Sequence, residues 1–231
     1  MTTPCERKPV RSAGAAVWLA ALLVCPGAPP ASGEDAPAKR PPASRTEPPP
    51  ACACEALGGG RKVESVRGRY TREVVGYRIP DVTLLDMEGG AVAVASVLDA
   101  EGPIAVQFIF TTCPTICGPL SGGLSALQEA TDAPLASLRL VSISIDPEHD
   151  RPELIRRYAK AFGAGPRWRF YTGDRDAIVA VQKAFDAYQV NKMGHQPLTF
   201  LRPRPAAPWV RLTGILGAAD LKEECRRMIH P

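Results

Sequence analysis

From about residue 80 onward, apolar runs typical of strands alternate with segments that have the apolar spacing of helices. Ile104–Phe110 is apolar at almost every position, which predicts a strand buried on both faces of a sheet. Leu138–Ile145 predicts the next strand. Val82–Asp86, a turn at residues 88–90 and a return over Ala91–Val94 predict a β-hairpin. These segments place a sheet at the centre of the fold.

Helical periodicity follows the predicted strands. Asp150 with Glu153 fits a capping box ahead of one helix. The expected helices are 121–130, 152–162, 175–188 and 220–228, and the expected last strands are 198–201 and 209–212. Strands that alternate with helices predict an α/β fold.

Residues 1–33 have the pattern of an export signal. Basic residues precede an apolar stretch over Ala13–Cys25, and small residues at 31–33 mark a cleavage site before Glu34. The apolar stretch is short for a membrane span, and the alternatives are a retained N-terminal anchor or a lipid on Cys25. The pattern predicts an exported protein, in the periplasm or on the outer face of the inner membrane.

Residues 34–62 predict a linker, because prolines interrupt any helix and three glycines close the segment. The folded domain is then expected over residues 63–231. The linker contains Cys52 and Cys54, a soft thiol pair that could pass a metal ion or reducing equivalents to other thiols. The alternative is an incidental or oxidised feature of the tail.

Composition narrows the function classes. The chain has 231 residues and a formal net charge of +4, a weak balance that argues against nucleic acid as a main partner. It has seven cysteines, and removal of the signal with Cys5 and Cys25 leaves an odd number. A chain whose cysteines all form structural disulfides would more often have an even number of them. In an oxidising compartment, reduced thiols need a reductant or a bound metal.

Cys113 and Cys117 follow the most apolar strand directly. We expect this stretch to open a helix with Pro114 in its first turn, which places both sulfurs on one face. The positive end of the helix dipole would favour thiolate at both positions. Two such thiolates suit a soft metal such as Cu(I), or redox exchange. The alternative is a pair of packing cysteines.

Four stretches in this order resemble the SCO/SenC family of copper proteins. They are Phe108–Cys117, Ser144–Glu153, Pro80–Leu84 followed by Gly89, and Arg167–Gly173, and together they extend over about 70 to 215. The resemblance implies a thioredoxin-like fold, with a central mixed sheet flanked by helices and an inserted β-hairpin. It implies copper, as Cu(I) or Cu(II), bound by Cys113, Cys117 and a distal histidine at His195.

His195 precedes a predicted strand, in a loop that faces the cysteine helix in thioredoxin-like sheets. The family more often has Asp-His-Ser here, whereas this chain has Gly194, His195 and Gln196, which removes an acidic neighbour of the ligand. Met193 is a candidate thioether ligand, although a packing role is the expected one.

The remaining candidates are weaker. His149 lies in an acidic turn that could bind a harder ion, but helix capping accounts for Asp150 without a metal. His230 is expected to be solvated near the C-terminus. Cys225 is expected to pack within the last helix.

Two functions fit these residues. The leading hypothesis is an exported copper metallochaperone that helps to assemble the copper centre of cytochrome c oxidase, with the copper-receiving oxidase subunit and other copper chaperones or thiol reductants as partners. The alternative is a thiol–disulfide oxidoreductase that keeps a partner's copper-ligand cysteines reduced, or a redox or copper sensor. Copper(II) capture needs His195, whereas thiol exchange does not.

Overall fold

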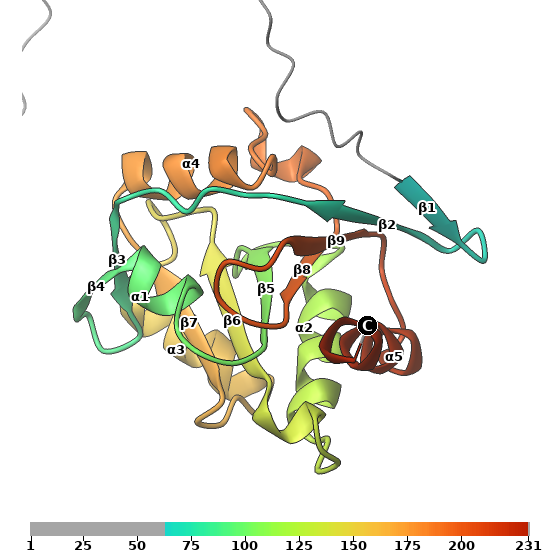
Figure 1. The fold of residues 1–231 in the computed structure, drawn as a ribbon. Helices are drawn as coiled ribbons and strands as arrows, with labels where there is room; N and C mark the ends of the chain where they lie inside the picture. Colours follow the sequence, from blue (N-terminus) through green and yellow to red (C-terminus); the bar gives the residue numbers. More distant parts are fainter. Residues whose placement is uncertain (1–62, 231) are drawn as a thin grey trace, which may run out of the picture. The chain divides into compact units, whose positions relative to one another are not determined.

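The computed structural model describes residues 63–230. Within them, nine strands form one mixed sheet in the order β1-β2-β9-β8-β5-β6-β7-β3-β4 (Figure 1). The strands are β1 (Val63–Val66), β2 (Tyr70–Val75), β3 (Thr83–Asp86), β4 (Ala91–Ala93), β5 (Ile104–Ile109), β6 (Arg139–Ser144), β7 (Trp168–Thr172), β8 (Leu198–Arg202) and β9 (Trp209–Thr213). The helices are α1 (Val94–Leu98), α2 (Cys117–Gln128), α3 (Pro152–Ala161), α4 (Arg175–Ala184) and α5 (Ala218–Ile229), with 3₁₀ helices at Leu135–Ser137 and Lys192–Gly194.

The centre of the sheet confirms the α/β prediction. β5 pairs in parallel with β6, and β6 pairs in parallel with β7, whereas β8 joins the other side of β5 antiparallel. The predicted hairpin is β3 and β4, and it adds to β7 at the edge of the sheet. Because β5 and β6 run in parallel, the loops that follow them leave the sheet at the same edge.

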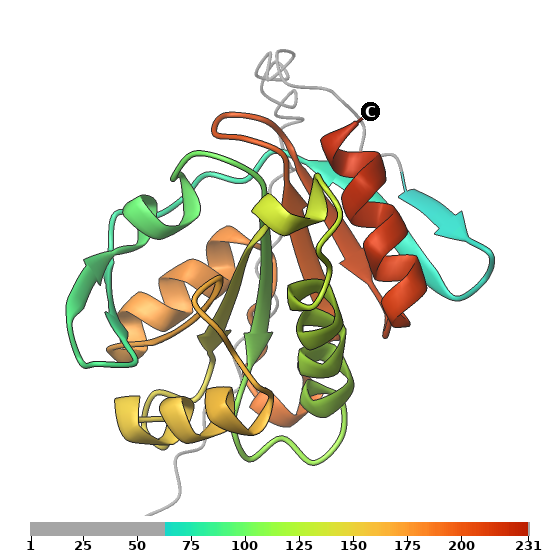
Figure 2. The same ribbon diagram turned by 90° about the horizontal axis from the view of Figure 1, so that it is seen from below.

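Side chains of β5 alternate between two cores, as expected for a strand buried on both faces. Ala105 and Ile109 face the core that is covered by α2, α3 and α5. Val106 and Phe108 face the core covered by α1 and α4. Figure 2 shows α2, α3 and α5 in front of the strands. Burial of side chains of this size contributes about 1.5–3 kcal/mol each, so the strand is firmly fixed beneath the loop that follows it.

The first two strands of the described residues were not predicted from the sequence. β2 pairs antiparallel with β9, and β1 extends the sheet outward from β2. Two side chains of β2 reach α5: the Tyr70 hydroxyl donates to Glu224 at 2.9 Å, and Arg72 Nε donates to the same carboxylate at 3.1 Å. Glu224 is buried, and these donors compensate for its loss of water.

Helices α3 and α4 each differ from the prediction. The predicted capping box of α3 is wrong, because Arg151 is the N-cap and no side chain caps it. Asp150 is instead buried and bonded elsewhere, as described below. The helix predicted to reach Tyr188 ends at Ala184, since Asp186 adopts a left-handed conformation with φ of +51°.

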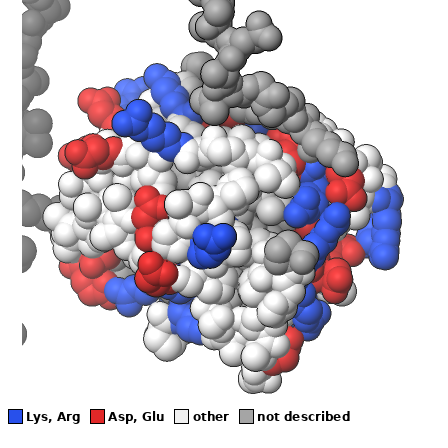
Figure 3. All heavy atoms as spheres, viewed as in Figure 1, with Lys and Arg blue, Asp and Glu red and all other residues white. Residues whose placement is uncertain are grey.

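No helix among residues 63–230 is long and apolar enough to cross a membrane. On the face seen in Figure 3, positive and negative side chains lie interspersed around broad areas without charge.

Helices α2 and α5 approach closely at a glycine. A Cβ on buried Gly123 would lie 3.1 Å from Leu221 Cδ2 of α5, whereas a Cβ on the exposed neighbour Gly122 would meet nothing within 4 Å. The two positions have the same helical context but different surroundings, so they form a matched pair for measuring this contact.

We predict that Gly122→Ala raises the free energy of unfolding by up to about 1 kcal/mol, through helix propensity alone. Gly123→Ala gains the same propensity but displaces Leu221, and overpacking costs about 1–3 kcal/mol. Urea denaturation followed by tryptophan fluorescence should therefore rank Gly123→Ala below Gly122→Ala. Equal stabilisation by both changes would show that α2 and α5 are not closely packed here.

Candidate metal centre

Cys113 lies in a turn between β5 and α2, not on the helix. The Cys113 N–H donates to the Phe110 carbonyl at 3.1 Å, and α2 begins only at Cys117. The prediction that both cysteines share a helix face is therefore wrong. Pro119 explains the late start, because a helix that began at Pro114 would place Pro119 in its interior, without an N–H and against a preceding carbonyl. In the observed register Pro119 lies in the first turn, where it is tolerated.

The Cys113 sulfur lies over the N-terminus of α2. It accepts a hydrogen bond from the Cys117 backbone N–H at 3.4 Å. Burial raises the pKa of the Cys113 thiol, but hydrogen bonds from the Cys117 thiol and from the backbone N–H groups of residues 115–117 outweigh it and lower the pKa overall. The Cys113 thiol is therefore more acidic than an ordinary cysteine thiol, as predicted from the helix terminus.

Cys117 differs from its partner. It is the first residue of α2, and only 1% of its surface is exposed. Burial, and next its hydrogen bond to Cys113, raise the pKa of the Cys117 thiol well above its ordinary value. The expectation of two acidified thiols is therefore wrong: the pKa of one thiol is lowered and that of the other is raised.

His195 completes the cluster, although it lies 78 residues beyond Cys117 in the sequence. It caps the short helix Lys192–Gly194, and its imidazole is buried with its edge against the Phe110 ring, 5.3 Å between centroids. Its Nε2 lies 3.7 Å from Cys113 Sγ and 3.5 Å from Cys117 Sγ. Burial lowers the pKa of His195, which favours the neutral imidazole that can bind a metal.

These three donors could bind one metal ion. Their ligand atoms all lie within 4.8 Å of one another, and no other group of three or more such ligands occurs among residues 63–230. In tetrahedral zinc sites, bonds of about 2.0–2.3 Å place neighbouring donors roughly 3.5 Å apart, which is close to the spacing here. Two sulfurs and one imidazole form a soft set suited to copper, with room for a further ligand.

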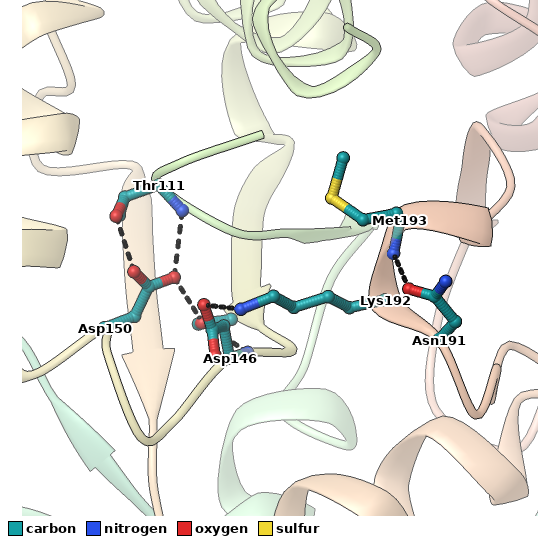
Figure 4. Close-up of polar contacts among 7 residues, drawn as sticks. Thr111, Asp146, Asp150, Asn191, Lys192 and Met193 are labelled. Atoms are coloured by element: carbon teal, nitrogen blue, oxygen red, sulfur yellow. Dashed lines mark hydrogen bonds and ion pairs between the residues drawn. The ribbon is translucent and has the colours of Figure 1, made fainter. Parts of the chain in front are cut away.

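Residues that the sequence did not mark as site residues lie around the cluster. Asp150 accepts hydrogen bonds from the Thr111 N–H at 2.9 Å and the Thr111 hydroxyl at 2.5 Å, which fixes the start of the cysteine turn (Figure 4). Lys192, three residues before His195, has its Nζ 2.5 Å from Asp146. On α3, the Tyr158 hydroxyl donates to the Cys117 carbonyl at 3.3 Å.

The signals for these residues were weak. A local capping pattern accounts for Asp150 in the sequence, whereas its actual partner Thr111 lies 39 residues away. Nothing near Lys192 in the sequence indicates an ion pair with a residue 46 positions away.

The other candidate histidine and cysteine side chains among the described residues are not part of the cluster. His149 and His230 are exposed. Met193 is 56% exposed, which corrects the expected packing role. Cys225 is fully buried as predicted, and burial raises the pKa of its thiol to about 12. Cys52 and Cys54 lie outside the described residues.

The sequence model of the SCO1/SenC family matches residues 79–201, more than half of the chain. The chain belongs to the SCO1/SenC family. Its curated relatives include the SCO1 protein homolog of Bacillus subtilis, which is 32% identical over 107 residues. That match covers 46% of this SCO1/SenC chain and 54% of the relative, so it spans about half of the relative's length.

Solved structures of the family confirm the thioredoxin-like fold. A SCO1/SenC lipoprotein of Bacillus anthracis gives a TM-score of 0.57 at 20% identity, covering 67% of this chain and 96% of that one. BsSco, described as a member of the Sco family of cytochrome c oxidase assembly proteins with a disulfide switch, gives 0.56 at 23%, covering 68% and 96%. Copper-bound ScoI of Arabidopsis thaliana gives 0.54 at 23%, covering 64% and 94%.

We predict that the two thiols of this SCO1/SenC protein react at different rates. In the reduced, metal-free protein, iodoacetamide should label Cys113 before Cys117 and Cys225, because among these three only Cys113 has a lowered pKa and the thiolate is the nucleophile. As pH falls, labelling of Cys113 should persist below the range of an ordinary cysteine, while Cys117 and Cys225 stay slow. Peptide mass spectrometry at several pH values measures this, and faster labelling of Cys117 would contradict it.

Proposed function

We propose that this protein binds one copper ion as cargo through Cys113, Cys117 and His195 and transfers it to the copper-receiving subunit of cytochrome c oxidase. One observation supports this above all others. A histidine that lies 78 residues beyond Cys117 in the sequence has its Nε2 3.5 Å from the Cys117 sulfur. A structural role for the two cysteines would not require a buried imidazole directed at both sulfurs.

The donor set suits both oxidation states of copper. Thiolates are soft ligands that select Cu(I), and imidazole adds affinity for Cu(II). The family's Arabidopsis member was solved with copper bound, and BsSco is described as an oxidase assembly protein. Together with the three donors, these relatives favour copper as the cargo and oxidase assembly as the process.

Unequal burial of the two thiols suits transfer to another protein. Cys113 is partly exposed, while Cys117 is buried beneath it. A partner thiolate can therefore approach copper from the side of Cys113 and displace that ligand first, with Cys117 and His195 still bound. Three protein donors also leave a position at which the incoming ligand can bind before any bond breaks.

We further propose that the transfer takes place outside the cytoplasm. The export pattern of residues 1–33 supports this, and the family member from Bacillus anthracis is described as a lipoprotein. Other copper chaperones, and reductants that keep the thiols reduced, are the expected further partners. A role of Cys52 and Cys54 in transfer stays a prediction.

A second function is supported by the unequal thiols themselves. Cys113 as thiolate could attack a partner's disulfide and form a mixed disulfide, releasing one partner thiolate that takes up a proton. Cys117 would then lose its proton and displace the second partner thiol. The partner gains two electrons, and Cys113 and Cys117 end as a disulfide. Because this route does not use His195, variants of that residue distinguish the two functions.

We predict one Cu(I) per chain, in a background where Cys52 and Cys54 are serine so that the arm contributes no thiols. Changing Cys113 and Cys117 together to serine should abolish binding, because serine offers no soft ligand. Anaerobic titration with metal counted per chain measures this. Cys225→Ala serves as the control and should keep one Cu(I), whereas full binding by the Cys113/Cys117 double variant would refute the site.

His195 should matter most for Cu(II). In the intact site, charge transfer from thiolate to Cu(II) should give a strong visible band. His195→Ala should lose or shift this band while most Cu(I) binding remains, because two thiolates still serve the softer ion. Absorption spectra with Cu(II), and titrations with Cu(I), test the two halves of the statement. An unchanged spectrum would exclude His195 as a ligand.

A further inference from the structure

The turn over residues 146–150 lies between the two loops that supply the metal ligands. It follows β6, and the Asp150 N–H donates to the Asp146 carbonyl at 2.7 Å, which closes the turn. The two carboxylates of the turn have different partners. One bonds to the cysteine turn and the other to the histidine loop, as Figure 4 shows.

Asp150 contacts the cysteine side. It has no exposed surface, and it accepts three hydrogen bonds: two from Thr111 and one from the Ser144 hydroxyl at 2.6 Å. A buried carboxylate is stable only when its oxygens are fully bonded, so Thr111 is fixed relative to the end of β6. Cys113 lies two residues beyond Thr111, within the same turn.

Asp146 contacts the histidine side through Lys192. Its side chain is 8% exposed, and Lys192 Nζ lies 2.5 Å away. The Lys192 carbonyl accepts the His195 N–H at 3.2 Å, and its ammonium lies 5.5 Å from the centre of the Phe110 ring. The same ring packs against the His195 imidazole, so Lys192 adjoins His195 through its backbone and through Phe110.

The ion pair joins a half-exposed ammonium to a buried carboxylate. Lys192 is 43% exposed, so solvent screens its side of the pair, whereas Asp146 is only 8% exposed and would lose its charged partner if the ammonium were removed. The contacts of Lys192 also fix the position of one backbone loop relative to another. Removal of the Lys192 ammonium should therefore disturb the geometry around His195 as well as lower the stability of the domain.

We propose that this turn positions the two halves of the metal site separately, with Asp150 fixing the cysteine half through Thr111 and Asp146 fixing His195 through Lys192. All four are positioning residues, since none of them supplies a donor to the cluster. The inference rests on the proposed function. It implies that loss of Lys192 weakens Cu(II) binding selectively, whereas loss of the Thr111–Asp150 contact weakens Cu(I) binding.

Lys192→Met in the full-length protein tests the histidine half. Cu(II) affinity should fall about tenfold, the lower end of what loss of a supporting residue around a metal ligand costs, and the charge-transfer band should shift. Cu(I) affinity, measured against a competing chelator, should change less than twofold. Lys192→Arg keeps the positive charge and should restore Cu(II) affinity, and Val190→Ala, at a position 93% exposed in the same loop, should have no effect.

Three results would overturn this half of the proposal. They are an unchanged Cu(II) affinity in Lys192→Met, an equal loss of both oxidation states, or no recovery in Lys192→Arg. If instead the parent protein bound no copper at all, the proposed function would fail first, and the two failures are thereby distinguishable. In the metal-free protein, Lys192→Met should also move the NMR signals of the His195 ring, which tests its positioning without copper.

Thr111→Val tests the cysteine half. Asp150→Asn could prevent folding, whereas Thr111→Val removes one hydroxyl and keeps the Thr111 N–H bond to Asp150. Cu(I) affinity should fall about tenfold and the alkylation rate of metal-free Cys113 should change, while Thr111→Ser should restore both. Parental Cu(I) affinity and alkylation in Thr111→Val, or failure of Thr111→Ser to restore them, would overturn this half.

Discussion

The parallel pairing of β5 with β6 is the constraint on which the site depends. Both strands are buried, and both end at one edge of the sheet, so the loops that follow them must meet there. The buried carboxylate of Asp150 joins the two loops. Asp150 lies in the loop after β6, and it accepts a hydrogen bond from Thr111 in the loop after β5. Because a buried carboxylate tolerates few other arrangements, the cysteine turn has little freedom to move.

The unequal character of the two thiols follows from where α2 begins. Pro119 disfavours a helix that starts as early as Pro114, and α2 begins at Cys117. The Cys113 sulfur therefore lies outside the helix but above its free N–H groups. Cys117 is then carried into the core with the first turn. At a site with one partly exposed, acidified thiol and one buried thiol, an incoming ligand has a defined direction of approach, from the side of Cys113.

Local patterns in the sequence predicted those features that depend on local contacts. The unbroken apolar run of β5 and the soft ligands Cys113 and Cys117 could be found in this way, and His195 through family resemblance. Asp150 was misassigned, because its partner Thr111 lies 39 residues away while a local capping pattern fits equally well. The strands β1 and β2 were missed because β1 is mostly exposed and β2 is buried only at its two ends, so neither shows an apolar period.

The close approach of α2 and α5 at Gly123 has a consequence for the order of folding. Helix α2, which begins at Cys117, packs its buried face against a helix made about a hundred residues later in the chain. Contacts between such distant segments form late, after the chain has paid the entropy of closing a long loop. During vectorial synthesis, the face of α2 that packs on α5 would stay uncovered until α5 emerged, so this part of the domain is the last to gain its full apolar cover.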